Sequence, residues 1–322
     1  MYSELLSLVE RIVTHPLYYL VGIASDRLIY ESTVEKTTDL WSMPIDEGEA
    51  IKLASRVVEV SRPRHGDDKI FYTLDVSKGK ELHKVYLVDV DGGEQYEAFE
   101  MEPVRIMGMA HLEDKIAYSG ASQKDNALYL SEIDGEAEKV YSNPMWLFVS
   151  DMNDKYVVGG GPLAGDPKSL EIFVYSILDN EFKIYTPKPG SFNLPSMIYK
   201  DKILLTSNWE GEKKLYLYDI KKETLFEPVF EGDEYRKFKF DDYQNYGFTD
   251  EGEIWFVGLS NYRGYAFLDG YSIYHPEGTP GNIDVYKEKI YMTFSNLKTP
   301  YGVYKTGFDK EEWSRVVGEE LD

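Results

Sequence analysis

Short apolar stretches that begin at or just after an acidic residue recur along the chain, and each runs out into a polar loop. Seven occur, with first residues 36 to 51 positions apart. They are Asp26–Tyr30, Asp68–Tyr72, Asp114–Tyr118, Asp154–Val158, Asp201–Leu205, Gly252–Phe256 and Glu288–Met292. Strand-like repeats of about 40 to 50 residues are typical of a β-propeller, in which each repeat forms one blade.

A second apolar, aromatic-rich stretch follows each of the first by about a dozen residues, as expected for strands joined by short connections. These stretches are Leu40–Asp46, Val85–Asp91, Leu128–Asp134, Ile172–Asp179, Leu215–Lys221 and, more weakly, Tyr265–Gly270 and Tyr301–Lys305. Turns such as Asp134-Gly135 then lead into a last strand, because Gly supplies the positive φ that tight hairpins require. The pattern predicts an all-β, seven-bladed β-propeller with four strands per blade.

Two further predictions concern the details of this ring. The glycine-rich segment 159–165 is interpreted as a long loop between the second and third strands of blade four. The segment Glu312–Val317 can form the last strand of blade seven, so every blade is built from contiguous chain. We therefore expect an open ring, closed only by packing between blades one and seven.

The first residues break the strand pattern. Leu5, Leu8 and Ile12 recur at helical spacing, and Pro16 ends the run. This predicts an amphipathic N-terminal helix in residues 1–15, ahead of a propeller in residues 16–322. A helix this short is not stable alone in water, so its apolar stripe packs either on its own propeller or on another domain or subunit.

Composition limits the classes of partner. With 57 acidic and 35 basic residues the net charge is −22, which disfavours nucleic acid and anionic membrane surfaces. The chain has no cysteine, which excludes disulfides and thiolate chemistry and suits a protein that works at high temperature. No apolar stretch approaches the roughly 20 residues of a membrane span. We expect a soluble, cytoplasmic protein.

Several motifs together resemble the propeller of acylaminoacyl peptidases, which are prolyl-oligopeptidase-like serine peptidases. They are Val9–Ile12, Asp75–Gly79, Pro103–Ile106, Val149–Asp151, Phe267–Gly270 and Ser295–Pro300, in an order and spacing that cover essentially the whole chain. In that family the propeller gates substrates and caps a C-terminal α/β-hydrolase domain that carries the Ser-Asp-His triad. The resemblance implies a non-catalytic gating propeller whose partner is an α/β-hydrolase domain or another protein, with peptides as further ligands.

Catalytic motifs are missing from the sequence. A nucleophile elbow needs Gly-x-Ser-x-Gly, and the nearest segment, Gly270–Tyr274, has Tyr where the second Gly must stand. The five histidines are scattered, which predicts no metal site and no cofactor. Thr249–Trp255 resembles the aspartate box of sialidases, but the motif occurs only once in the chain. A glycosidase also needs two placed carboxylates, and no such pair can be singled out from the sequence. We expect no enzyme activity from this chain alone.

The alternative to a gating propeller is a free-standing interaction scaffold, similar to propellers of the TolB type.

Loops between the second and third strands should line one rim of the ring. By the resemblance, the blade-two loop 75–81 reaches toward the hydrolase, where Glu81, with Lys78 nearby, would pair with an arginine; the alternative is a solvated hairpin tip. Trp209 and Tyr262 are candidate contact residues at loop tips, unless they pack on a neighbouring blade. The other rim loops are 33–38, 123–126, 161–169, 208–213, 260–264 and 296–300.

Overall fold

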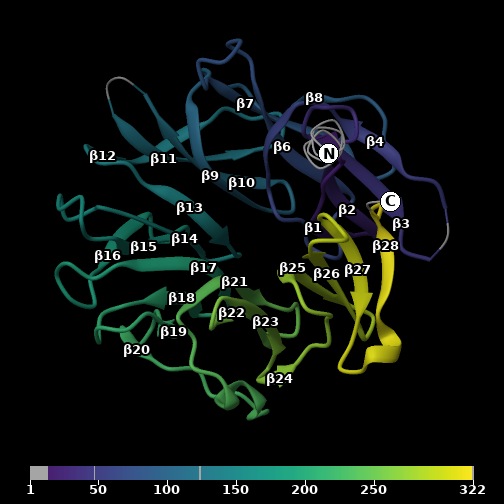
Figure 1. The fold of residues 1–322 in the computed structure, drawn as a ribbon. Coiled ribbons are helices and arrows are strands. Elements are labelled where there is room, and N and C mark those ends of the chain that lie inside the picture. The colour runs from purple at the N-terminus through teal and green to yellow at the C-terminus, as the bar shows by residue number, and fades with distance from the viewer. Residues whose placement is uncertain (1–13, 47, 123–124, 321–322) are drawn as a thin grey trace, which may run out of the picture.

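Seven four-stranded antiparallel sheets surround a central axis in the computed structural model (Figure 1). The structure describes residues 14–46, 48–122 and 125–320. The expected helix, residues 1–15, lies almost entirely in residues 1–13, outside the described part, as do Leu5, Leu8 and Ile12. The division at residue 15 therefore stays a prediction. The fold class is confirmed: the chain is a seven-bladed β-propeller.

Each blade is made of four consecutive strands, as predicted. Blades one to four comprise β1 (Tyr18–Ala24), β2 (Arg27–Ser32), β3 (Asp39–Pro44), β4 (Ile51–Ala54); β5 (Val57–Val60), β6 (Lys69–Asp75), β7 (His83–Asp89), β8 (Tyr96–Glu97); β9 (Arg105–Leu112), β10 (Lys115–Ala121), β11 (Asn126–Glu132), β12 (Glu138–Asn143); and β13 (Phe148–Met152), β14 (Tyr156–Gly161), β15 (Glu171–Ser176), β16 (Glu181–Tyr185). Blades five to seven comprise β17 (Asn193–Tyr199), β18 (Lys202–Ser207), β19 (Lys214–Asp219), β20 (Thr224–Phe226); β21 (Asp242–Phe248), β22 (Ile254–Ser260), β23 (Arg263–Leu268), β24 (Tyr271–Ser272); and β25 (Thr279–Tyr286), β26 (Lys289–Ser295), β27 (Gly302–Thr306), β28 (Ser314–Val317).

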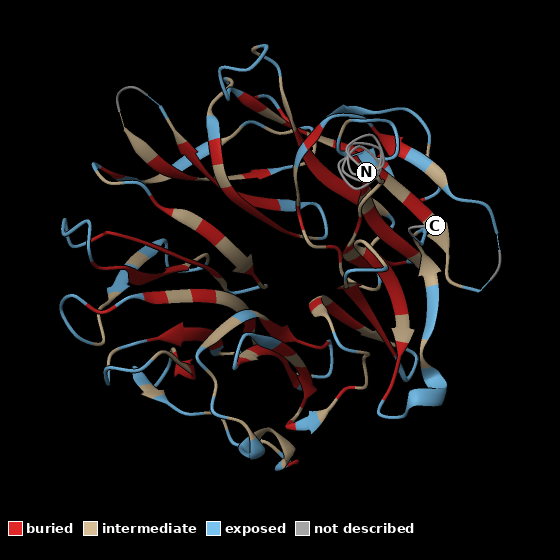
Figure 2. Cartoon of the chain, in the orientation of Figure 1, coloured by how far each residue is buried: buried red, intermediate tan, exposed pale blue. Residues whose placement is uncertain are grey.

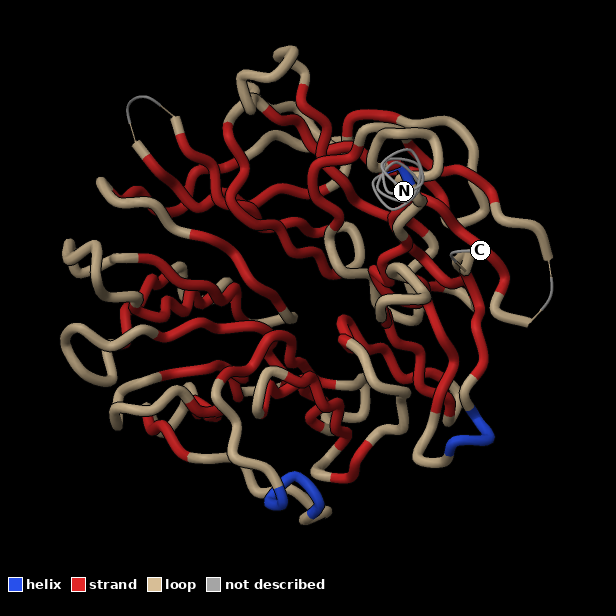
Figure 3. Tube along the Cα trace, in the orientation of Figure 1, coloured by secondary structure: helices blue, strands red, loops and turns tan. Residues whose placement is uncertain are grey.

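The recurrent apolar stretches of the sequence are the second strands of the blades. In β6, Ile70, Phe71 and Tyr72 are all 1% exposed or less. Such a strand is apolar on both faces because each blade is covered on both sides by its neighbours. The outer strands are more exposed, so the core forms a ring between the blades (Figure 2). Described helix is limited to Thr14 and two short 3-10 turns, η1 (Glu234–Lys237) and η2 (Lys310–Glu312) (Figure 3).

The interpretation of segment 159–165 as a loop is partly wrong. Gly159, Gly160 and Gly161 belong to β14, and only the residues after them form the connection to β15. A Cβ atom on Gly159 would lie 1.9 Å from the Phe148 carbonyl oxygen and 2.5 Å from the Phe173 ring. The glycines are therefore strand residues whose side-chain space is taken by neighbouring atoms, as happens where backbones approach closely.

The ring is open, as predicted, because blades one and seven share no strand. Among the described residues, Tyr18 N–H donates to the Tyr301 carbonyl at 2.9 Å, a single backbone bond between these blades. Their interface is otherwise closed by side chains. Leu20 N–H donates to Thr293 Oγ1 at 2.9 Å, and Asn282 Nδ2 donates to the Leu20 carbonyl at 3.1 Å.

The two ends of the described chain lie on the same side of the ring. Thr33 N–H donates to the Leu17 carbonyl at 3.1 Å, and Tyr18 Oη lies 3.5 Å from Glu319 Oε1. Because consecutive strands run antiparallel, the loops between the second and third strands also lie on this side. We call it the terminal face, and its counterpart, with the loops between first and second strands, the opposite face. No helix in the described residues has the length and apolar character needed to cross a bilayer.

Candidate functional site

The blade-two loop predicted from the sequence lies on the terminal face and has a defined shape. Asp75 organises it: Oδ1 accepts the Ser77 N–H and Oδ2 accepts the Gly79 N–H, both at 2.7 Å. The Ser77 hydroxyl also donates to Oδ1. This bond, followed by the backbone bonds, lowers the pKa of Asp75 to about 2. Lys78 and Glu81 both have positive φ, at 58° and 57°. The loop is therefore held in one turn by a carboxylate that favours its ionised form.

Glu81 already has a partner within the chain. Its Oε2 lies 3.1 Å from Arg105 Nε, and both side chains are more than half exposed. An exposed pair of this kind adds little stability. Glu81 and Lys78 remain predicted interface residues, located on the terminal face with their charged groups open to solvent.

The two predicted aromatic contact residues differ in exposure. Tyr262, at the tip of the loop between β22 and β23, is fully exposed, with a φ of 63°. Trp209 is only partly exposed, because its ring packs edge-on against Tyr216 of its own blade, with ring centroids 6.2 Å apart. Both residues lie in the predicted loops of the terminal face, and Tyr262 is the more exposed of the two; their role as contact residues stays a prediction.

Exposed apolar side chains gather in the loops of the terminal face. Among the described residues, seven large hydrophobic side chains in these loops are exposed: Val34, Val76, Leu82, Trp146, Phe192, Tyr262 and Leu297; Val229 is also exposed, in the long connection from β20 to β21. The loops of the opposite face carry two, Leu178 and Phe308. Single exposed hydrophobic residues are ordinary, but their concentration on one face is typical of an interaction surface.

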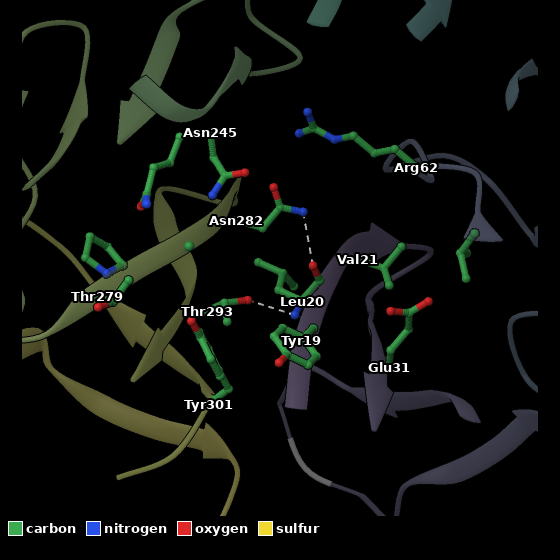
Figure 4. A pocket seen from close by; sticks show the side chains of 14 residues that line it. Tyr19, Leu20, Val21, Glu31, Arg62, Asn245, Thr279, Asn282, Thr293 and Tyr301 are labelled. Carbon is green, nitrogen blue, oxygen red and sulfur yellow. Dashed lines mark hydrogen bonds between the residues drawn. The ribbon is translucent and has the colours of Figure 1, made fainter. Parts of the chain in front are cut away.

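A chamber of about 590 Å³ opens at the centre of the same face (Figure 4). It lies between the inner strands of blades one, two, six and seven. Near its mouth the rings of Tyr19 and Tyr301 lie side by side, tilted by 35° with centroids 4.9 Å apart, and Glu31 lines the wall. Deeper, Asn245 and Asn282 contribute amides. Its size suits a short peptide segment.

Two carboxyl groups near the chamber are partly removed from water. Burial raises the pKa of Glu31, which lines the wall. Burial also raises the pKa of Glu59 on β5 to about 7; the Met109 backbone N–H lowers it and the Glu31 charge raises it further. The two carboxyl groups therefore share one region of the inner wall, and Glu59 is partly protonated near neutral pH.

A long loop of blade two lies across the opposite end of the channel. The segment Ser61–Asp68 connects β5 to β6 and is called the plug here. Its Pro63 lies against Gly22 of blade one, where a Cβ atom would be 3.0 Å from Pro63 Cγ. Arg64 Nη2 reaches across to Asp151 Oδ1 of blade four at 3.3 Å. The plug thus contacts blades on both sides of the axis.

His65 attaches the plug to two more blades. Its Nδ1 lies 2.8 Å from Asp250 Oδ2 of blade six, and its Nε2 lies 3.1 Å from Asp284 Oδ1 of blade seven. Burial lowers the pKa of His65, but the hydrogen bonds to the two aspartates outweigh it and raise the pKa to about 9. The ring is therefore an imidazolium at neutral pH, held between two carboxylates.

Both ends of the plug are held by a histidine of blade three. His111, on β9, has a fully buried side chain. Its Nδ1 lies 2.7 Å from Ser61 Oγ and its Nε2 lies 2.8 Å from Asp67 Oδ2. The latter oxygen also accepts the Arg64 N–H at 2.6 Å. One side chain thus fixes the beginning and the end of the plug.

Neither the plug nor the chamber was predicted from the sequence. One signal was present: the plug has eight residues, whereas the first and second strands of blades one, three and seven are joined by two. Its stretch Arg62-Pro63-Arg64-His65 is also unusually basic for an acidic chain.

The segment Gly270–Tyr274, the nearest approach to a nucleophile elbow, includes the short outer strand β24. No group of three or more metal-ligating side chains occurs in the described ranges.

Residues 30–304 match the family described as acylamino-acid-releasing enzyme-like, N-terminal domain. The chain belongs to this family. The match is to the propeller domain, and no hydrolase domain is matched.

Solved structures with the same fold include peptidases of the prolyl oligopeptidase group. A prolyl endopeptidase studied for the role of inter-domain dynamics in catalysis and specificity has a TM-score of 0.72 at 14% identity, over 95% of this chain and 49% of that one. Prolyl oligopeptidase B from Galerina marginata has a TM-score of 0.65 at 10% identity, over 95% of this chain and 52% of that one. The chain therefore spans about half the length of these peptidases.

An isolated propeller also matches. The β-propeller domain of the Trilobed protease from Pyrococcus furiosus, which has an open velcro topology, gives a TM-score of 0.66 at 14% identity. The match covers 93% of this chain and 95% of that one. At such identities the likeness establishes the fold. It agrees with the open ring found here.

Proposed function

We propose that this propeller gates substrates for an α/β-hydrolase domain, which it covers with its terminal face, and that catalysis resides on that domain. The hydrolase domain belongs either to the same polypeptide or to a separate one. The proposal rests on the location of three features on the same face of the ring. The mouth of the chamber, the exposed apolar loops and both described chain ends lie on one face.

Each of these features favours a second domain on the terminal face. Exposed apolar residues such as Tyr262 and Leu297 gain free energy when a partner covers them. The chamber mouth would then open onto the partner, so a peptide held in the chamber is presented to the catalytic site. Charged groups such as Glu81 and Lys78 would fix the orientation of the two domains rather than add much affinity.

Gating follows from size. A chamber of about 590 Å³ accommodates a few residues of extended peptide and excludes a folded protein. Covering the hydrolase with such a ring restricts cleavage to short peptides, and the family assignment favours peptides with acylated N-termini. The acidic, cysteine-free composition supports a cytoplasmic site of action.

Reconstitution with a hydrolase domain tests the proposal. The hydrolase domain of an acylamino-acid-releasing enzyme is assayed with and without this chain, on a short acylated peptide and on an unfolded acylated protein. We expect the propeller to leave peptide cleavage intact or raise it, and to suppress cleavage of the long chain. Equal cleavage of both substrates with and without the propeller would contradict gating and favour a free-standing scaffold.

A further inference from the structure

Arg62 is the residue of the plug that projects into the channel. Figure 4 shows its guanidinium on the opposite side of the chamber from Tyr301, beyond the amides of Asn245 and Asn282. Arg62 lines both the chamber and an adjoining cavity of about 310 Å³ between blades four to seven. Among the described residues, no other lysine or arginine lines either space. Arg62 is therefore the cationic residue that faces these two spaces, whereas Arg64 and His65 of the plug are paired with Asp151, Asp250 and Asp284.

The neighbouring carboxylate does not satisfy this guanidinium. Asp284 Oδ1 is 3.7 Å from Arg62 Nη2, beyond hydrogen-bond distance, and already faces His65 Nε2 at 3.1 Å and the Val285 N–H at 2.9 Å. Its other oxygen accepts the Ile23 N–H at 2.9 Å. Arg62 thus keeps most of its five donors for another partner, although its side chain is only 31% exposed.

Other contacts hold the guanidinium in place without using up its donors. It lies 5.7 Å from the Trp255 ring centroid, a cation–π distance, and its Nη1 lies against the Met197 sulfur, a weak acceptor. Asn245, between the mouth and Arg62, forms no side-chain hydrogen bond within the described part of the chain. A positioned fork of donors next to an unpaired amide is suited to a carboxylate followed by a peptide backbone.

We propose that Arg62 binds the carboxylate of a short peptide that enters the chamber from the terminal face, with the carboxyl end toward the plug. This inference rests on the proposed gating of peptides. The N-terminal part of the peptide then points out of the mouth, past Tyr19 and Tyr301, toward the partner domain. Carboxylates reach such a site from two sources, the free C-terminus or an Asp or Glu side chain near it, and the test distinguishes them.

Calorimetric titration of the whole chain with three acetylated tetrapeptides tests the site. The probes are acetyl-tetraalanine with a free carboxylate, its C-terminal amide, and the amide with aspartate as the last residue. We expect the free acid to bind roughly tenfold more tightly than the amide, because a partly exposed, charge-assisted hydrogen bond contributes about that much to affinity. Tighter binding of the aspartate amide than of the acid would assign the site to side-chain carboxylates.

Variants at position 62 separate binding from folding. Arg62→Gln should bind the acid and the amide equally, and Arg62→Lys should retain part of the preference, because an ammonium keeps the charge without the bidentate fork. Arg236→Gln, at an exposed arginine of η1, should behave as wild type. Unfolding temperatures of all variants are measured to show that each is folded.

Two outcomes would overturn the inference. One is equal binding of acid and amide by the wild type, and the other is an undiminished preference in Arg62→Gln. Both leave the gating proposal standing, because suppression of long-chain cleavage is measured independently in the reconstitution. Loss of gating with a retained acid preference would overturn the gating proposal instead.

Discussion

Nε2 of His65 lies 3.1 Å from Oδ1 of Asp284, although 219 positions separate the two residues in the sequence. The contact joins the plug of blade two to the inner strand of blade seven. Asp284 also accepts the Ile23 N–H of blade one. Blades one, two and seven therefore meet at a single carboxylate, next to the place where this open ring has no shared strand.

Replacing His65 by Gln should destabilise the protein in a pH-dependent manner. The pKa of His65 is about 9 in the folded protein and 6.5 when unperturbed, so its charge stabilises the fold fully below pH 6.5. This contribution is lost as the pH rises through 9. We expect His65→Gln to lower the unfolding free energy by about 1–2 kcal/mol at pH 6, a value reduced by the exposure of Asp250.

Urea denaturation of wild type and His65→Gln at pH 6, 8 and 10 measures this effect. The groups around the ring are Asp250, Asp284, Tyr286 and the plug residue Arg62. The stability difference should shrink steadily from pH 6 to pH 10. A difference that is constant or grows with pH would show that the imidazolium is not what stabilises the plug.

Replacing His111 should loosen the plug at its base. His111→Phe keeps a ring against Phe71, whose centroid is 4.7 Å away, but leaves the buried Ser61 hydroxyl without its partner and Asp67 with only the Arg64 N–H on that oxygen. Unpaired buried polar groups of this kind cost about 1–3 kcal/mol. Amide hydrogen exchange should become faster in the plug, at Asp67 N–H in particular, and remain unchanged in blade five. Unaltered exchange in the plug would contradict the role of His111.

A methyl group at Gly108 should force blades three and four apart. Gly108 has a φ of 146°, and a Cβ atom there would lie 2.3 Å from the Val149 carbonyl oxygen on β13. We expect Gly108→Ala to lower the unfolding free energy by about 3 kcal/mol, from strain and overpacking together. Gly66→Ala is the matched control, since nothing lies within 4 Å of its Cβ position. Thermal unfolding of the two variants should separate them, and equal stability would contradict this packing.

The architecture was predictable from the sequence because it depends on local repetition. Each second strand, such as 69–75, is buried on both faces and is therefore continuously apolar. The turns after the third strands contain residues such as Gly92, with a φ of 83°. The order of strands and the open closure follow from the same repeat. Gly159–Gly161 were misread because glycine in a sequence favours a loop, whereas here Phe148 and Phe173 fill the space above the strand.

The candidate site was less predictable because its residues are brought together by the closed ring. Arg62 and Asn282 lie about two-thirds of the chain apart, and neither belongs to a motif with fixed spacing. The exposure of Tyr262 was predictable from its place at a loop tip. The partial burial of Trp209 was not, since it depends on the position of the Tyr216 ring in the same blade.

Polar substitutions on the terminal face should weaken the association with a hydrolase domain without affecting the fold. Tyr262 and Leu297 are 103% and 99% exposed, so the double variant Tyr262→Ser with Leu297→Ser should unfold at the wild-type temperature. Its affinity for the domain should fall by roughly tenfold or more, because exposed aromatic side chains often anchor interfaces. Leu178→Ser is the matched control, 81% exposed on the opposite face.

Sedimentation velocity of these mixtures tests the central claim most directly. The wild-type chain and Leu178→Ser should sediment together with the hydrolase domain of an acylamino-acid-releasing enzyme, whereas the Tyr262/Leu297 double variant should sediment separately at the same concentrations. If the wild type and both variants associate with the domain with equal affinity, or if only Leu178→Ser loses the association, the terminal face is not the one that covers the catalytic domain.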